Sequence, residues 1–236
     1  MIRKIPFNKS AAWSRGLIFL ISLVCTGFTS TPLEEFKSAA EKIHTLKADF
    51  VQEKHLKILS TPLISTGLFR YQAPDSFRWE YRSPIKNLVL MQAGDLSHYE
   101  WTERGFQKTT GHGFQGIQGV FEEITRWLKG DFDRDGAFTV SFQEDEIVLI
   151  PRKEAFRQWI HRIVLTLSQR PGVIQSVTLY EGADSYTRII FKDVQVNADL
   201  SPSCFRPLSL GQDPIRSHET SSVRHIFGYP NTGHRP

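Results

Sequence analysis

Two short runs of alternating residues flank a proline turn between Gly67 and Tyr81, where the sequence reads GLFRYQAPDSFRWEY. In the second run, Phe77, Trp79 and Tyr81 alternate with charged residues. Successive side chains of a β-strand point to opposite faces, so the three aromatic side chains share one face. The segment therefore predicts a β-hairpin with one broad aromatic face and one charged face.

The same period of two recurs along most of the chain. Turn signals such as Ala73-Pro74-Asp75 and Arg170-Pro171-Gly172 separate the runs. We expect strands at residues 48–56, 63–71, 76–82, 86–91, 96–101, 105–109, 137–143, 146–151, 159–167, 173–180 and 186–194. The spacing is typical of consecutive antiparallel hairpins, and strands do not alternate with helices as in a parallel sheet. The predicted fold class is mainly β, with a few helices.

Two helices are expected beside these strands. Thr31-Pro32-Leu33-Glu34 has the pattern of a capping box with proline at the first helical position. Apolar residues then recur at helical spacing, at Leu33, Phe36, Ala40, Ile43 and Leu46. The second helix is short, and Gly130 is expected just after its end. Its apolar face comprises Val120, Phe121, Ile124, Trp127 and Leu128.

The aromatic face of residues 76–82 is the candidate site. We expect neighbouring strands to continue this face through Phe50, Leu68, Leu88, Leu90, Tyr99 and Trp101. The helices carry apolar side chains that need cover, and we expect these to lie over the sheet: Phe36, Ile43, Phe121, Ile124, Trp127 and Leu128. A filled core and a ligand pocket both remain open, because periodicity does not distinguish them.

The first thirty residues have the pattern of a secretory signal. Arg3, Lys4, Lys9 and Arg15 precede an apolar stretch at residues 16–28. Small residues near its end favour cleavage around residues 27–31, and an uncleaved N-terminal anchor is the alternative. We therefore expect a signal peptide at residues 1–30, one domain at residues 31–205, and a basic tail at residues 206–236 that lacks apolar periodicity and is disordered or loosely attached.

Charge and cysteine content exclude some classes of protein. The chain has 29 Lys and Arg against 25 Asp and Glu, and the signal contains four of the basic residues. The remainder is balanced, so we expect no nucleic-acid partner, since binding to phosphates needs clustered cations. Only Cys204 lies beyond the signal, which excludes an intramolecular disulfide in the mature chain.

No recognisable catalytic or metal site emerges from the motifs. Residues 131–136, DFDRDG, resemble the start of a calcium loop, but position 12 is Phe142 rather than glutamate. The eight histidines show no paired-ligand spacing, and no phosphate-binding or nucleophile motif is present. We therefore expect no metal, no cofactor and no enzymatic activity. A secreted hydrolase is the alternative, and it lacks a recognisable nucleophile or metal set.

The stretch from Gly67 to Tyr81, followed by Ser83-Pro84, resembles the signature of the outer-membrane lipoprotein carrier (LolA-like) family. Residues 48–52, residues 93–95 with Tyr99, and residues 191–197 also resemble the family in the same order. The resemblance covers roughly residues 33–205. It implies an unclosed antiparallel β-barrel of about eleven strands, with two or three helices as a lid over an apolar cavity lined by Phe77 and Trp79.

The resemblance also implies a function in the periplasm. Members receive acylated lipoproteins from an inner-membrane ABC-type extractor and pass them to an outer-membrane acceptor; other lipids are possible cargo, and we expect a monomer. Family members often have an arginine that latches the lid at the position where this chain has Ala73. Arg70 or Arg78 could take its place, although we expect Arg78 to face away from the cavity. The alternative is a periplasmic lipoprotein-sensing or protein-interaction module on a similar half-barrel.

Overall fold

The structure is a computed structural model that describes residues 31–109, 121, 123–133, 136–182 and 184–207. The elements in chain order are α1 (Pro32–Ala40), β1 (Thr45–His55), β2 (Leu63–Gln72), β3 (Ser76–Ser83), β4 (Asn87–Gln92), β5 (Asp95–Thr102), β6 (Gly105–Thr109), β7 (Phe138–Gln143), β8 (Glu146–Pro151), α3 (Glu154–Arg157), β9 (Arg162–Leu167), β10 (Ile174–Tyr180), β11 (Tyr186–Val196) and η2 (Pro202–Phe205). The predicted signal peptide and residues 208–236 of the predicted tail lie outside the described residues.

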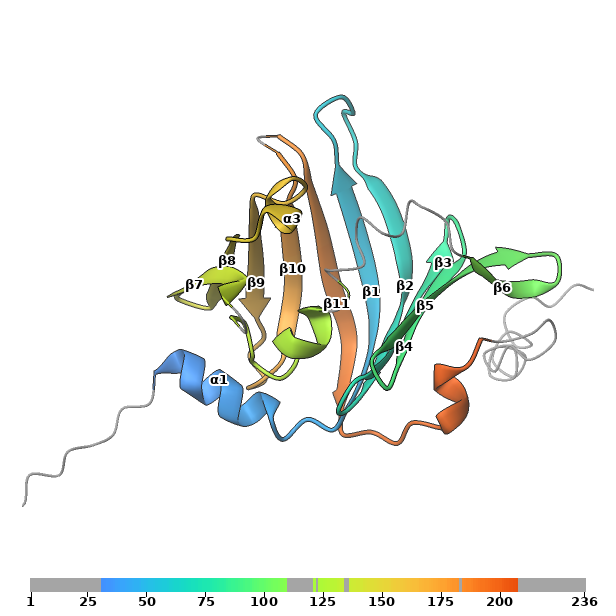
Figure 1. The fold of residues 1–236 in the computed structure, drawn as a ribbon, viewed down its shortest axis with the longest axis horizontal. Helices are drawn as coiled ribbons and strands as arrows, with labels where there is room; N and C mark the ends of the chain where they lie inside the picture. Colours follow the sequence, from blue (N-terminus) through green and yellow to red (C-terminus); the bar gives the residue numbers. More distant parts are fainter. Residues whose placement is uncertain (1–30, 110–120, 122, 134–135, 183, 208–236) are drawn as a thin grey trace, which may run out of the picture.

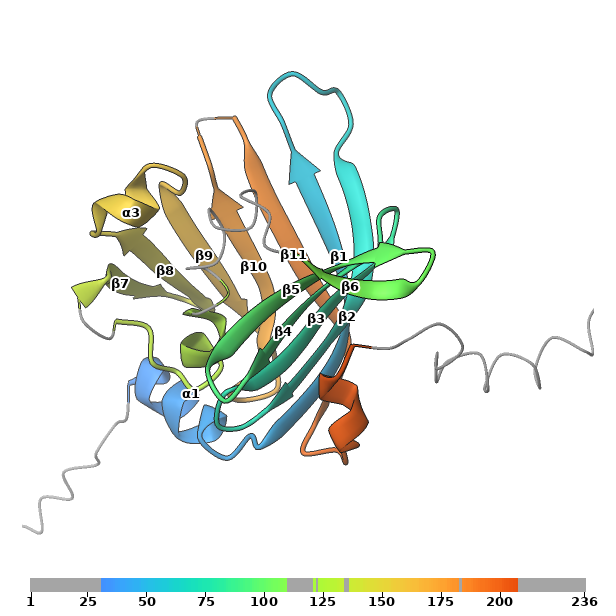
Figure 2. The same ribbon diagram turned by 45° about the vertical axis from the view of Figure 1, so that its right-hand side comes forward.

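All eleven strands form one antiparallel sheet in the order β6-β5-β4-β3-β2-β1-β11-β10-β9-β8-β7. The first and last strands of the chain are neighbours at its centre, where Phe50 lies opposite Phe191. Strands β6 and β7 are the two ends of this order, so the sheet curls into a half-barrel without closing (Figure 1; Figure 2). The predicted mainly-β, unclosed antiparallel architecture is confirmed.

Helix α1 begins as the sequence predicts and ends earlier. The Thr31 hydroxyl accepts a hydrogen bond from the Glu34 amide at 3.3 Å, and the Glu34 carboxylate accepts one from the Thr31 amide at 2.9 Å. The helix ends at Ala40, so Ile43 lies in the connection to β1 and Leu46 lies in the strand. The prediction that these two residues extend the helix is wrong.

A distant side chain explains where α1 ends. Asn197, just after β11, accepts a hydrogen bond from the His44 amide at 2.8 Å and donates one to the Lys42 carbonyl at 3.0 Å. These bonds satisfy backbone groups that a continuing helix would have paired internally. The long-range contact thereby fixes the extended connection into β1.

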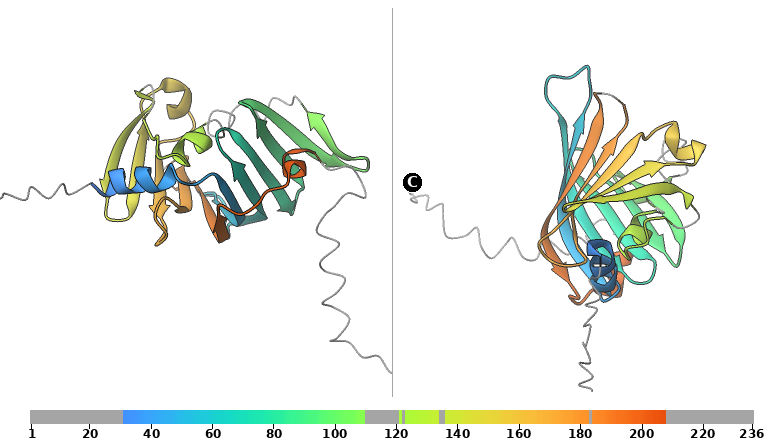
Figure 3. Two further views of the ribbon diagram at one scale, coloured as in Figure 1. Left: turned by 90° about the horizontal axis from the view of Figure 1, so that it is seen from below. Right: turned by 90° about the vertical axis from the view of Figure 1, so that its left-hand side faces the viewer.

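A short helical segment lies on the concave side of the sheet (Figure 1; Figure 3). We call it the inner helix; it comprises residue 121 and residues 123–127, and Gly130 follows with a φ of +73°. Phe121 joins an apolar cluster over β1–β4, and Trp127 joins a second cluster over β7–β10. Ile124 contacts both clusters, so one core runs beneath the inner helix. Within the described part of the chain, no helix is long and apolar enough to span a bilayer.

The stretch before β9 differs from its prediction. The sequence predicts that residues 159–161 lie in a strand, but β9 begins at Arg162. The short helix α3 precedes it, and the Ile160 amide donates to the Phe156 carbonyl at 2.8 Å, which continues the helical turn. Trp159 is consequently an exposed residue on a turn rather than part of the sheet.

Candidate functional site

Strand register defines which side chains line the concave face. Trp79 lies directly opposite Phe69 on β2 and Val89 on β4, and Phe77 lies opposite Tyr71 and Met91. Directly opposed residues in antiparallel strands point to the same face. This face continues across β1 and β11 into the apolar side chains of β7–β10.

Aromatic rings pack closely at the centre of this concave face. The Trp79 ring centroid lies 4.7 Å from that of Phe50 and 5.3 Å from that of Phe69. Phe191 on β11 adds a further edge contact with Trp79 at 6.0 Å. Phe77 is 0% exposed and Trp79 2% exposed, so these side chains form a continuous aromatic platform that is shielded from water.

The inner helix covers that platform with its own ring. The Phe121 centroid lies 5.7 Å from Trp79 and 6.1 Å from Phe77. At the other side, Trp127 contacts Phe138 on β7 at 6.1 Å. Periodicity leaves a filled core and a pocket as alternatives, and the resemblance implies a cavity lined by Phe77 and Trp79. In the structure, side chains of the protein itself occupy the space above these two residues.

The placement of five predicted site residues is wrong. Leu68, Leu88 and Leu90 lie opposite Glu80 or Arg78, and therefore point to the convex face. Tyr99 lies opposite Leu88, so it shares this face. Trp101 packs there at 4.9 Å from Phe106 and belongs with Leu88 and Leu90 to a separate apolar cluster.

The structure places other apolar residues on the concave face in their stead. They are Phe69, Tyr71, Val89, Met91, Ile189 and Phe191. Of the predicted helix residues, Phe36, Phe121, Ile124, Trp127 and Leu128 contact the concave clusters, and Ile43 contacts them from the connection after α1. Phe36 packs against Phe132 at 5.6 Å rather than over the aromatic platform.

Neither candidate arginine latches the lid, because both point to the convex side. Arg78 donates to the Glu80 carboxylate at 2.6 Å and to the Arg206 carbonyl at 2.8 Å. Arg70 donates to the Ala48 carbonyl at 2.7 Å. The expectation that Arg78 faces away is confirmed, and its bond to Arg206 ties the segment after η2 to the outside of β3. Ala73 instead bonds the α1–β1 connection through its amide.

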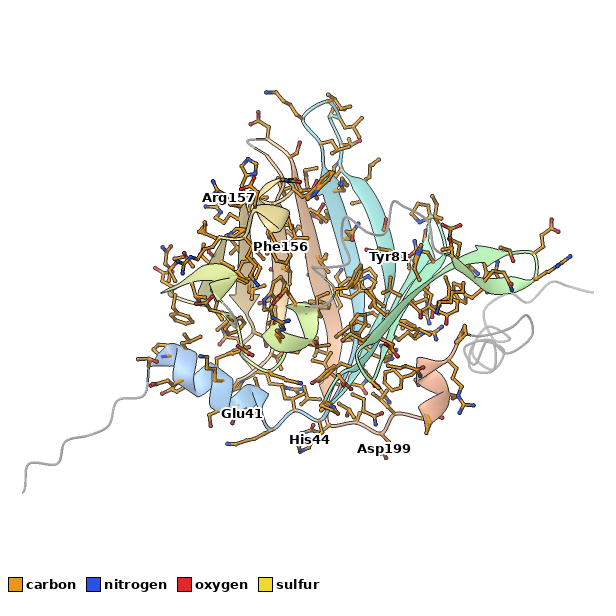
Figure 4. The ribbon with its side chains drawn as sticks, in the orientation of Figure 1. Glu41, His44, Tyr81, Phe156, Arg157 and Asp199 are labelled. Atoms are coloured by element: carbon orange, nitrogen blue, oxygen red, sulfur yellow. The ribbon has the colours of Figure 1, made fainter. Side chains whose placement is uncertain are left out.

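Few polar groups reach the aromatic platform. The Tyr81 hydroxyl donates to the Gln52 side-chain carbonyl at 2.7 Å, and Figure 4 shows Tyr81 on β3. Burial raises the pKa of Tyr81 to about 12. Burial also raises the pKa of Tyr71 to about 12, with a further contribution from Asp75. Both phenols are neutral at physiological pH, as an ordinary tyrosine also is, so they place no charge on this face.

Two pockets open at the α1 end of the half-barrel. One of about 540 Å³ lies between Lys37 and Ile43 on one side and Tyr71 and Asp131 on the other. The other pocket, of about 460 Å³, has Leu33 and Phe138 among the residues that line it. The first pocket borders the aromatic platform through Tyr71 and Ile43, both of which belong to the same apolar cluster as Trp79.

The acidic stretch at residues 131–136 has a structural role at Asp133, whose carboxylate accepts a hydrogen bond from the Phe138 amide at 3.3 Å. Among the described residues, no group of three or more His, Cys, Asp or Glu side chains could hold a metal ion. The chemistry of the concave face is therefore that of an apolar surface.

Residues 41–207 match the family model described as outer membrane lipoprotein carrier protein LolA. An outer-membrane lipoprotein carrier protein from Methylococcus capsulatus is 27% identical, over 80% of this chain and 91% of its own length. The protein of that name from Nitrosospira multiformis is 22% identical, over 80% and 90%. A solved LolA superfamily protein from Nitrosomonas europaea aligns with a TM-score of 0.39 and 10% identity, covering 75% of this chain and 98% of its own. Because the family model spans most of the sequence, this chain belongs to the outer membrane lipoprotein carrier protein LolA family.

Proposed function

We propose that this protein is a periplasmic carrier that binds the acyl chains of lipoproteins, or of related lipids, on its concave face. One observation carries the proposal: an uninterrupted aromatic and aliphatic platform lies beneath a short helix that contacts it through rings. The relatives' shared name, outer-membrane lipoprotein carrier protein, supports lipoproteins as the cargo. An inner-membrane extractor and an outer-membrane acceptor would be its donor and recipient.

The energetics suit a carrier. Burying an acyl chain of ~14 methylenes gains roughly 11 kcal/mol at about 0.8 kcal/mol per CH₂. In this protein, cargo takes the place of the Phe121 ring, so apolar contacts with Phe77 and Trp79 are exchanged rather than created. The net affinity is therefore lower than the gross gain, which allows the cargo to be released.

Leu96 offers a direct test of the site. It is half-buried on β5, lies opposite Met91 and packs against the aromatic cluster, so it can be changed with less damage than Phe77. Leu96→Glu places a carboxylate at the wall that cargo would contact, and its desolvation opposes binding. Ile150→Glu is the matched control, because Ile150 is exposed on β8 and points to the convex face.

The assay measures binding of a triacylated lipopeptide by displacement of an apolar fluorophore, beside mass spectrometry of lipids that co-purify with the protein. We expect Leu96→Glu to weaken lipopeptide binding by roughly tenfold or more, with Ile150→Glu unchanged. Equal weakening by both variants, or by neither, would contradict a site on the concave face.

A further inference from the structure

The exposed apolar side chains of this protein gather at one end of the half-barrel. Strand register places three connections at that end: the β1–β2 hairpin, the β3–β4 turn and the α3–β9 turn. Six of the seven large exposed hydrophobic side chains in the described residues lie on them. They are Ile58, Leu59, Leu63, Ile64, Ile85 and Trp159, and Ile150 is the seventh.

The β1–β2 hairpin contributes most of this surface. It extends beyond the rest of the sheet (Figure 1; Figure 2), and its tip carries Ile58 at 87% exposed beside Leu59 and Leu63. Its base is held in place, because Lys57 pairs with Asp184 at 3.0 Å and Lys54 pairs with Glu181 at 3.2 Å. The apolar tip is in contact with water unless a partner covers it.

Cations accompany the apolar residues on the other two connections. Lys86 follows Ile85, which is 74% exposed, and lies over the Trp101 ring at 4.9 Å. Arg157 precedes Trp159, which is 61% exposed, and Figure 4 shows Arg157 at the α3 end. Lys153 is exposed just before α3, and Arg157 lies 3.9 Å from the Glu154 carboxylate.

The opposite end of the half-barrel has a different character. Figure 4 shows Glu41, His44 and Asp199 there, Asp75 lies in the β2–β3 turn, and Asp95 is the first residue of β5. None of the seven large exposed hydrophobic residues lies at that end. The two ends thus differ in apolar exposure, whereas both carry acidic and basic residues: Glu154 and Glu181 lie at the hairpin end, and Lys37 and Lys129 lie at the other.

We propose that the end carrying the β1–β2 hairpin docks on the surface of an anionic lipid bilayer. Apolar side chains on a protruding tip insert into a bilayer without needing a complementary groove. Tryptophan and basic residues are the types that favour the bilayer interface, and cations are attracted to anionic headgroups. The proposal does not rest on lipid carriage by the concave face, because it concerns vesicles without lipoprotein.

A fluorophore on the hairpin tip tests the proposal locally, so lipid binding by any other segment does not produce the signal. Both native cysteines are replaced by serine in the full chain, and an environment-sensitive dye is attached through Ser60→Cys. Asp95→Cys carries the control dye at the opposite end. Vesicles are phosphatidylcholine with phosphatidylglycerol, or phosphatidylcholine alone.

We expect a blue shift from the dye at residue 60, but not at residue 95, with the anionic vesicles, and a weaker response at high salt. Adding Ile58→Ser and Leu59→Ser should lower the apparent vesicle affinity roughly tenfold or more, whereas Ile150→Ser should leave it unchanged. No shift at residue 60, or a shift that the double variant leaves intact, would overturn the proposal. Self-association that depends on Ile58 and Leu59, without vesicle binding, would assign the hairpin to a second copy and also overturn it.

Discussion

Removing the Phe121 ring should make the protein less stable and at the same time a tighter binder of acyl chains. In Phe121→Ala, the contacts of this ring with Trp79 at 5.7 Å and Phe77 at 6.1 Å are lost. Phe121 is buried, and truncating a buried phenylalanine to alanine costs about 3–5 kcal/mol. We expect a loss of about 3 kcal/mol, at the lower end of this range, because Phe121 is 6% exposed and so is not fully enclosed.

The same contacts determine the expected gain in affinity. If acyl chains bind on the platform as proposed, cargo must first displace the Phe121 ring, and the variant removes that cost. If the full 3 kcal/mol is recovered, lipopeptide affinity rises about 150-fold, and partial recovery gives about tenfold. Stability is measured by urea unfolding monitored by tryptophan fluorescence, and affinity by fluorophore displacement.

Phe156→Ala supplies the matched control. Phe156 on α3 contacts Phe138 at 5.3 Å, so its truncation also removes a ring from the core, but away from Phe77 and Trp79. It should destabilise the protein without a gain in affinity. If folded Phe121→Ala binds lipopeptide as the wild type does, or more weakly, the inner helix does not occupy the cargo site and the reasoning fails.

Three further changes test the surroundings of the site. The pKa of Tyr81 in the folded protein is about 12, above its ordinary value of 10.0. The stability that the neutral phenol contributes is therefore complete below pH 10.0 and is lost as the pH rises through 12. Tyr81→Phe should reduce this alkaline loss of unfolding free energy, measured by urea unfolding. Gly172→Ala should lower the free energy of unfolding by about 2 kcal/mol more than Gly94→Ala. Both glycines have a positive φ, but only a Cβ at residue 172 would clash with α1, at 2.6 Å from the Ala40 amide nitrogen. Equal losses in the two variants would contradict this close approach. Glu80→Leu should lower the free energy of unfolding by about 3 kcal/mol, because it leaves the buried Arg78 without its carboxylate partner. Adding Arg78→Met should restore most of that free energy. Strictly additive effects in the double-mutant cycle would refute the pairing.

The sequence predicts the strands well because turn residues mark their ends. Pro74 and Gly172 stand in connections between strands, and the expected strand at residues 105–109 coincides with β6. Alternation also assigns the faces of β3 correctly, since aromatic and charged residues differ sharply there. Strand existence and the orientation of β3 are thus local properties of the chain.

The faces of β4 could not be predicted in this way. Leu88, Val89, Leu90 and Met91 are all apolar and all buried, so the strand has no polar side to orient it. Only its register with β3 places Val89 and Met91 on the concave face. The prediction that Tyr99 lies on the concave face is wrong for a related reason. The convex face has an apolar cluster of its own, so an aromatic residue type does not identify the concave face.

A concave face filled by the protein's own side chains changes what carriage requires. A hollow chamber would leave Trp79 and its neighbours without contacts whenever cargo is absent, at the expense of stability. Here Phe121 provides those contacts, and the pocket beside Tyr71 and Ile43 reaches the edge of the same cluster. An acyl chain that enters there would exchange one apolar contact for another as it displaces the inner helix. The affinity of the carrier would then depend on how firmly the inner helix is held, and not on the size of a preformed cavity.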